Sequence, residues 1–133
     1  MALRPFVDTN VLLYLLSGET AKADRAEALL AGRIVISVQV LNEFASVARR
    51  KLQLPWPDVS QALQDIRRFA DVRPLTVATH ELGIELAQRY QLGLYDAMIA
   101  AAALEAGCTT LQSEDFSTGQ RLDGRLTIRN PFA

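Results

Sequence analysis

The sequence predicts an α/β fold in which a mostly parallel sheet of four to five strands lies between layers of helices. Short apolar runs of strand length alternate along the chain with longer stretches of helical spacing. The segment 96–106 is almost entirely apolar, which is typical of a helix buried on most sides. Strands that alternate with helices usually form a parallel sheet, because each helix carries the chain back to the same edge.

The first part of the chain alternates two strands with two helices. A short apolar strand over 5–7 leads into an apolar helix over 11–16. Apolar residues of helical spacing predict a second helix over 19–30, with Gly32 as its C-cap. The run 34–37 is β-branched and has the length of a strand.

The middle of the chain is predicted to form two helices and an edge strand. The helices cover 38–52 and 57–70, and two prolines between them mark a break. The segment 71–75 has the length of a strand but contains a proline, so we expect it at an edge of the sheet. Trp56, between the two prolines, is expected to pack in a loop, with contact to a partner or nucleic acid as the alternative.

The last part of the chain contains two helices and two strands. Helical spacing covers 76–90, and the nearly all-apolar helix over 96–106 must be buried. A central strand over 109–112 and a final strand over 126–128 follow. We expect one domain over 1–133, because the chain shows no linker, repeat or low-complexity stretch.

Composition is typical of a globular protein, with 133 residues, 50% hydrophobic and 22% charged. No apolar run approaches the roughly 20 residues that span a bilayer, so we expect no membrane partner. The N-terminus reaches Asp8 without the apolar region of a signal peptide, which favours a cytoplasmic protein. The one cysteine, Cys108, cannot form an intramolecular disulfide and is expected to be a small buried filler.

The formal net charge of −1 conceals an uneven balance of acids and bases. If four candidate metal-binding acids are set aside, eleven acids remain against fourteen basic residues, twelve of them arginine. Arginine binds phosphate in a bidentate manner, so an acidic pocket within a basic surface points to nucleic acid. Arg49, Arg50, Arg67 and Arg68 are the candidate RNA contacts; ordinary solvated helix faces are the alternative.

Four acids occupy comparable places in this pattern. Asp8 follows the first strand, and Glu43 lies among apolar residues in the helix after the second. Asp96 opens the most buried helix, and Asp115 follows the strand over 109–112. In open α/β sheets ligands bind outside the carboxyl ends of the strands, so we expect the four acids to meet at that edge.

Carboxylates gathered in a partly dry site repel one another unless a cation neutralises them. Oxygen ligands favour Mg²⁺ or Mn²⁺, and zinc is disfavoured because the chain has one cysteine and one histidine. Two such ions about 4 Å apart suit in-line attack of water on a phosphodiester.

Each acid also has a structural interpretation. Asp8 and Asp96 are favoured helix N-caps, Glu43 is compatible with a solvated helix face, and Asp115 with a turn. The lack of a Gly-rich turn after the first strand argues against a dinucleotide-binding domain. The only histidine, His80, sits at a predicted helix start and is expected to cap it or to be exposed.

Four motifs occur in a recognisable order and spacing: Phe6-Val7-Asp8-Thr9-Asn10, the helix around Glu43, Leu94-Tyr95-Asp96-Ala97 with its alanine-rich helix, and Leu111-Gln112-Ser113-Glu114-Asp115-Phe116. Together they resemble the PIN domain, and specifically the VapC-type toxins of bacterial type II toxin–antitoxin pairs. The resemblance implies that the four acids bind metal and carry catalysis. It also implies that Asn10, with Thr9 beside it, and Ser113 support the site. Glu114 stays unassigned between ligand and bystander.

The resemblance further implies a Mg²⁺-dependent endoribonuclease, with Mn²⁺ as a substitute, that cleaves structured RNA such as transfer or ribosomal RNA. It implies a homodimer and a VapB-like antitoxin whose C-terminal segment lies near the active site. The apolar helix over 11–16 offers a groove to a partner helix. Two alternatives stay open. One is a phosphatase with Asp8 as nucleophile, although Lys22 and Lys51 are badly placed for it; the other is a catalytically silent PIN-fold interaction domain.

Overall fold

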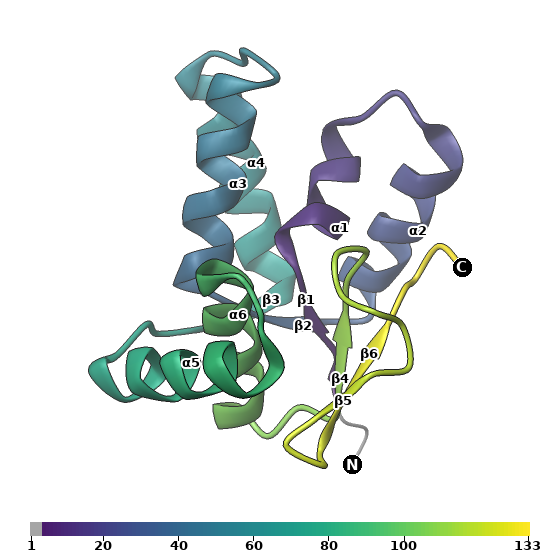
Figure 1. Ribbon diagram of the computed structural model, residues 1–133. Helices are drawn as coiled ribbons and strands as arrows, with labels where there is room; N and C mark the ends of the chain where they lie inside the picture. The colour runs from purple at the N-terminus through teal and green to yellow at the C-terminus, as the bar shows by residue number, and fades with distance from the viewer. Residues whose placement is uncertain (1–3) are drawn as a thin grey trace.

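Figure 1 shows the computed structural model of the protein, which describes residues 4–133. Within these residues the strands are β1 (Phe6–Val7), β2 (Ile34–Ser37), β3 (Ala70–Arg73), β4 (Thr110–Gln112), β5 (Arg121–Leu122) and β6 (Leu126–Arg129). The helices are α1 (Thr9–Leu13), α2 (Thr20–Ala31), α3 (Val38–Arg50), α4 (Trp56–Phe69), α5 (Val77–Tyr90) and α6 (Leu94–Glu105), with a 3₁₀ helix, η1 (Tyr14–Leu16), after α1. The predicted α/β fold class is confirmed.

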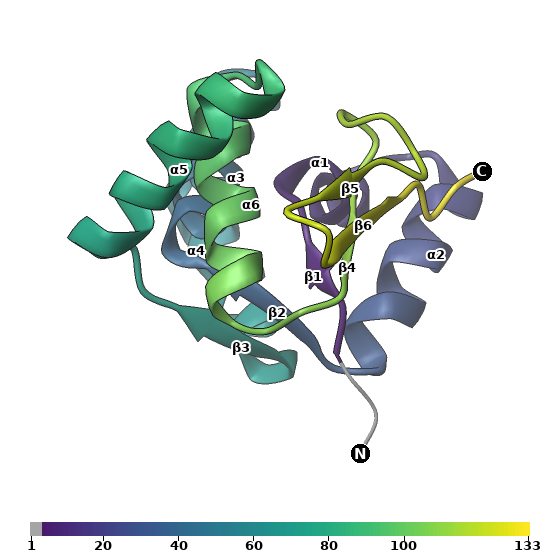
Figure 2. The same ribbon diagram turned by 60° about the horizontal axis from the view of Figure 1, so that its bottom comes forward.

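The strands form one sheet in the order β3-β2-β1-β4-β6-β5, and only β5 runs antiparallel to its neighbour. The chain steps along the sheet in one direction from β1 to β3 and returns from β3 to β4. Right-handed crossovers therefore place α1 to α4 on one face and α5 with α6 on the other. Figure 2 shows α5 and α6 side by side, on the opposite side of the sheet from α2.

Helix α6 is the most buried of the helices described, as its composition predicts. Every residue from Ala97 to Leu104 is buried, because the helix lies between the sheet and α5. Small side chains allow this close approach. A Cβ added to Gly83 of α5 would lie 2.6 Å from the sulfur of Met98, so this position leaves no room for a side chain unless Met98 moves.

Strand β5 was not predicted, and it makes the sheet six-stranded instead of four- or five-stranded. It pairs with β6 through a tight turn in which Asp123 has φ 54° and Gly124 has φ 64°. Positive φ at both central residues is typical of the type I′ hairpin turn, for which Asp-Gly is a preferred sequence. The signal was therefore present, but a two-residue strand is too short to show a period.

Several predicted boundaries differ from those observed. The helix predicted over 11–16 begins two residues earlier, and its last turn is 3₁₀. Helix α6 begins at Leu94 instead of Asp96. Trp56 does not pack in a loop: it is the first residue of α4, and 57% of its surface is exposed. The edge position of β3 is confirmed.

Cys108 is buried, as predicted, and His80 is exposed. Across residues 4–133, the helices are too short or too polar to cross a membrane.

Candidate metal centre

Asp8 lies between β1 and α1, at the carboxyl edge of the sheet. It is the N-cap of α1, and its Oδ1 accepts a hydrogen bond from the Thr9 N–H at 2.7 Å. Its Oδ2 accepts hydrogen bonds from the Ser113 hydroxyl at 2.7 Å and from Asn10 Nδ2 at 3.3 Å. The capping interpretation is therefore right for one oxygen, but the carboxylate is also tied to a loop that follows β4. It is 2% exposed.

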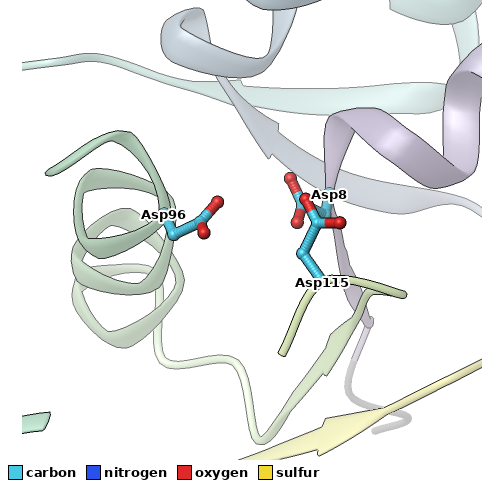
Figure 3. A group of neighbouring side chains, drawn as sticks. All are labelled: Asp8, Asp96 and Asp115. Carbon is cyan, nitrogen blue, oxygen red and sulfur yellow. The ribbon is translucent and has the colours of Figure 1, made fainter. Parts of the chain in front are cut away.

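Asp96 and Asp115 meet Asp8 from two other parts of the chain. One carboxylate oxygen from each of the three residues lies within 4.8 Å of the other two. Figure 3 shows Asp96 reaching from α6 toward Asp8 and Asp115, which lie side by side. Gly93, not Asp96, is the N-cap of α6, so the capping interpretation of Asp96 is wrong.

Glu43 lies close to this group without joining it. It is half-buried on α3, and its Oε2 accepts a hydrogen bond from Gln39 Nε2 at 3.1 Å. Burial raises the pKa of Glu43, and the negative charges of Asp96 and Asp115 raise it further, whereas the bond from Gln39 lowers it. Because Glu43 is half-buried and hydrogen-bonded to Gln39, it does not lie on a fully solvated helix face. Its predicted role as a metal ligand stays a prediction.

The pKa values of the clustered acids are shifted upward. Burial raises the pKa of Asp8 to about 7, and the charges of Asp96 and Asp115 add to this, against the lowering effect of Ser113 and Thr9. Burial and then the charge of Asp115 raise the pKa of Asp96. Bringing desolvated like charges together is unfavourable in free energy, and a bound cation offsets this effect.

The donor set fits a hard divalent cation. All candidate ligand atoms of the group are carboxylate oxygens, which Mg²⁺ and Mn²⁺ prefer. Oδ1 of Asp8 accepts one hydrogen bond and keeps a second lone pair for a cation, whereas Oδ2 already accepts two hydrogen bonds. The Thr9 hydroxyl is buried and, within residues 4–133, has no hydrogen-bond partner. A buried polar atom without a partner beside Asp8 is consistent with a hydrated ion at this place.

Ser113 joins two of the acids through one hydroxyl group. Besides donating to Asp8, its Oγ accepts hydrogen bonds from Asn10 Nδ2 at 3.3 Å and from the Asp115 N–H at 3.1 Å. Asn10 Oδ1 also accepts a bond from the Glu114 N–H at 3.3 Å. Ser113 and Asn10 therefore connect the start of α1 to the loop that carries Asp115, and their supporting role at a metal site stays a prediction.

Glu114 is not part of the acidic group. Its Oε1 accepts a hydrogen bond from the Tyr14 hydroxyl at 2.7 Å, and its Oε2 accepts one from Lys22 Nζ at 3.1 Å. Neither partner was predicted, because both lie about a hundred residues away and have no local signal. Gln39 was not predicted either, although its position four residues before Glu43 on a helix is a detectable spacing.

The candidate RNA-binding arginines fall into two places. Arg67 and Arg68 lie at the end of α4, directly before β3, whose first residue pairs with the first residue of β2. They therefore lie at the amino edge of the sheet, opposite the acids. Arg49 and Arg50 lie in the last turn of α3, roughly 10 Å along the helix from Glu43.

Arg49 is held in place beside an exposed aromatic ring. Its Nη1 donates to the main-chain oxygen of Leu54 at 2.9 Å, and its guanidinium lies 4.8 Å from the centre of the Trp56 ring. Arg50 is exposed. RNA binding by the four arginines stays a prediction. The position of Arg49 and Arg50 is more favourable for it than that of Arg67 and Arg68, which lie at the edge of the sheet opposite the acids.

A groove adjoins the acidic group between η1 and the end of α3. Its walls are mainly apolar and its residues are Asn10, Leu13, Tyr14, Ser17, Val47, Lys51, Leu52 and Glu114. Asn10 and Glu114 belong both to this groove and to the hydrogen bonds around the acids. The predicted apolar helix over 11–16 thus contributes to a surface groove.

Three solved structures resemble the whole fold. A chain of a toxin–antitoxin complex from Klebsiella pneumoniae is 23% identical, with 96% of this chain and 97% of that chain covered and a TM-score of 0.71. VapC20 from Mycobacterium tuberculosis, a Sarcin-Ricin loop cleaving toxin, is 22% identical over 83% and 88%, with a TM-score of 0.67. VapBC2 from Rickettsia felis, bound to a DNA fragment from its promoter, is 19% identical over 96% and 100%, with a TM-score of 0.66.

No curated protein matches the sequence. At these identities the solved structures show a shared fold. The sequence itself matches the PIN domain over residues 6–118, a span that includes all four predicted acids and Ser113. PIN proteins of the VapC type are nucleases, which agrees with a group of acids at the carboxyl edge of the sheet. The chain belongs to the PIN domain family.

Proposed function

We propose that this protein is a VapC-type endoribonuclease toxin that depends on Mg²⁺, accepts Mn²⁺, and cleaves structured RNA such as transfer or ribosomal RNA. The observation that carries the proposal is the meeting of Asp8, Asp96 and Asp115 within 4.8 Å in a PIN domain. Three segments distant in sequence supply these acids, and the pKa values of Asp8 and Asp96 are raised first by burial and further by the neighbouring acids. Clusters of this kind are favoured at functional sites.

Each acid has a role in the proposed reaction. Asp8, Asp96 and Asp115 would hold the cation. Glu43 would add a fourth carboxylate beside them. A bound Mg²⁺ supplies Lewis acidity toward the phosphodiester and lowers the pKa of water. Ser113 and Asn10 hold Asp8 and the loop of Asp115 in place.

The phosphatase alternative is disfavoured by the positions of the two lysines. Lys22 is paired with Glu114, and Lys51 lines the neighbouring groove. An aspartyl-nucleophile phosphatase needs a lysine beside the phosphorylated aspartate, and neither of these lysines lies in such a place.

The catalytically silent alternative is disfavoured by energetics. Keeping several desolvated carboxylates together destabilises a fold, and a domain that served only for interaction would gain stability by losing them. Asp8 alone, with its pKa raised to about 7, carries a penalty at neutral pH that a neutral side chain would avoid.

An antitoxin is the proposed regulatory partner. The groove beside the acids is apolar and leads to Asn10 and Glu114, so a partner segment bound in it would reach the entrance of the site. The Klebsiella relative comes from a toxin–antitoxin complex, and the Rickettsia relative is named VapBC2, which supports a VapB-like antitoxin here. We further propose a homodimer located in the cytoplasm.

The proposal is tested by mapping RNA 5′ ends after the protein is expressed without an antitoxin. We expect new 5′-phosphate ends at a small number of sites in transfer or ribosomal RNA. The Asp96→Asn variant should lose cleavage while keeping the wild-type circular dichroism spectrum. Purified protein should show the same cuts with Mg²⁺ and none with EDTA.

Asp123→Asn is the matched control, because Asp123 is an acid that pairs with Arg89 and Arg125 outside the acidic group. It should cleave as the wild type does. Undiminished cleavage by purified Asp96→Asn protein, or cleavage that persists in EDTA, would contradict the proposal.

A further inference from the structure

Glu114 is joined to residues from three other segments. Lys22 Nζ, which binds Glu114, also donates a hydrogen bond to the Tyr14 hydroxyl at 3.1 Å. The same ammonium group lies 4.6 Å from the centre of the Tyr14 ring and 5.3 Å from that of Phe132. The two rings pack edge to face, 4.9 Å apart. We name Tyr14, Lys22, Glu114 and Phe132 the latch.

The latch is a closed network of charge and hydrogen bonds. Hydrogen bonds to Tyr14 and Glu114 raise the pKa of Lys22 to about 12, so the lysine stays charged at physiological pH. The Glu114 carboxylate has partners for both oxygens, and the side chain is 24% exposed. A carboxylate satisfied in this way does not need a metal ion to neutralise it.

Asp115, in contrast, has little of its own to hold it. It is exposed, and in the part of the chain that the structure describes its carboxylate accepts no hydrogen bond. Its place beside Asp8 and Asp96 therefore depends on where the main chain of the loop runs. Four contacts set that path. The Ser113 N–H donates to the main-chain oxygen of Arg129 at 2.9 Å, and the Asp115 N–H donates to Ser113 Oγ at 3.1 Å. Asn10 Oδ1 accepts from the Glu114 N–H, and the Glu114 side chain enters the latch.

We propose that Glu114 is a positioning residue, which through the latch holds the loop of Asp115 at the distance from Asp8 and Asp96 that a shared divalent cation requires. This inference rests on the proposed function. In this role Glu114 does not bind the cation itself, but it affects cation binding through the loop of Asp115. Outer residues that orient metal ligands commonly affect metal affinity by about 10- to 100-fold.

A substitution of Lys22 distinguishes a positioning role of Glu114 from a simple effect of charge. Lys22→Met removes a positive charge near the acids, so electrostatics alone predicts tighter binding of a cation. Positioning predicts the opposite, because Glu114 loses its ion pair and the loop loses an anchor. Tyr14→Phe changes no charge and removes one hydroxyl, so only positioning predicts an effect.

The experiment measures Mn²⁺ affinity by isothermal titration calorimetry for the wild type, Tyr14→Phe, Lys22→Met and Glu114→Ala. We expect each variant to bind Mn²⁺ about tenfold more weakly, with no further loss when Tyr14→Phe is combined with Glu114→Ala. Glu114→Gln, which can still accept from Tyr14, should lose less than Glu114→Ala. Arg89→Met, which removes ion pairs outside the latch, should bind as the wild type does. Urea unfolding of each variant separates affinity from stability, and Tyr14→Phe keeps the test open if Glu114→Ala does not fold.

Several outcomes would overturn the inference. If Lys22→Met binds Mn²⁺ more tightly and Tyr14→Phe is unchanged, Glu114 acts through charge alone. If Glu114→Ala abolishes binding while the other two variants bind normally, Glu114 is a ligand. If stability falls but affinity does not, the latch is only structural. A wild-type protein that binds no Mn²⁺ would remove the proposed function and this inference together, whereas normal wild-type binding with unaffected variants removes this inference alone.

Discussion

Replacing Asp8 by Asn is expected to stabilise the metal-free protein at neutral and alkaline pH. Burial raises the pKa of Asp8 from 3.8 to about 7 in the folded protein. Between these values the folded state holds a proton that the unfolded chain has released. Raising the pH therefore favours the unfolded chain, and stability falls from about pH 4 to about pH 7, with no recovery above.

The magnitude follows from the size of the shift. One pKa unit corresponds to about 1.4 kcal/mol, so a shift of about three units costs about 4 kcal/mol at pH 8. Asn stays neutral and escapes this cost, but it loses the bond in which Asp8 accepts from Ser113, worth about 1 kcal/mol. We expect a net gain of about 3 kcal/mol in the free energy of unfolding at pH 8. At pH 4 the charge penalty is absent but the hydrogen bond is still lost, so we expect a net loss of about 1 kcal/mol.

The assay is urea unfolding followed by circular dichroism from pH 4 to pH 8.5 in EDTA. The wild type should lose stability across this range, and Asp8→Asn should lose less. Added Mg²⁺ should restore the wild type through ligand linkage and have a smaller effect on the variant. Asp123→Asn is the control, because hydrogen bonds from Arg125 and Arg89 lower the pKa of Asp123 and the sign is reversed. The reasoning is refuted if Asp8→Asn is less stable than the wild type at pH 8 in EDTA, or if the two pH profiles run parallel.

Three further predictions concern catalysis, RNA binding and the core. Ser113→Ala removes a hydrogen bond that lowers the pKa of Asp8, so the rising limb of the pH–rate profile should move about one unit higher; an unmoved limb would show that Asp8 ionisation does not control it. Replacing Arg49 and Arg50 by Ala should weaken RNA binding and reduce the salt slope by about 0.7 for each lost phosphate contact, as measured by filter binding across salt concentrations; an unchanged slope would place the RNA elsewhere. Phe44→Ala, at a fully buried position of α3, should lower the free energy of unfolding by about 3 to 5 kcal/mol in urea, and a loss below 1 kcal/mol would contradict the packing described.

The distribution of chemistry along the chain could be predicted because local periodicity carries it. The strands β1 and β2 are mainly apolar and β4 is centred on Leu111, and the acids Asp8 and Asp115 come shortly after β1 and β4. In a parallel sheet such positions come to one edge, whatever the details of packing. Asp8 and Asp115 were placed together by this rule, and the composition of α6 predicted its burial.

Local pattern was less informative where an element is short or irregular. Strand β5 has two residues, too few to show the alternation of apolar and polar residues that is typical of a strand. The sequence Asp123-Gly124 nevertheless indicates the turn that follows it. In the loop after β4, consecutive residues follow no regular alternation. The sequence thus offered no reason why Asp115 should join the acidic group while its neighbour Glu114 should bind Tyr14 and Lys22 instead.

Residue periodicity and the handedness of crossovers were enough to predict the fold class, the order of every element except β5, and the edge of the sheet at which the acids gather. The packed structure was needed to show that Asp8, Asp96 and Asp115 share one site, that Glu43 lies beside it, and that Glu114 pairs with a lysine 92 residues away. Those outcomes depend on distances between segments remote in sequence, and such distances are set when the helices pack on the sheet.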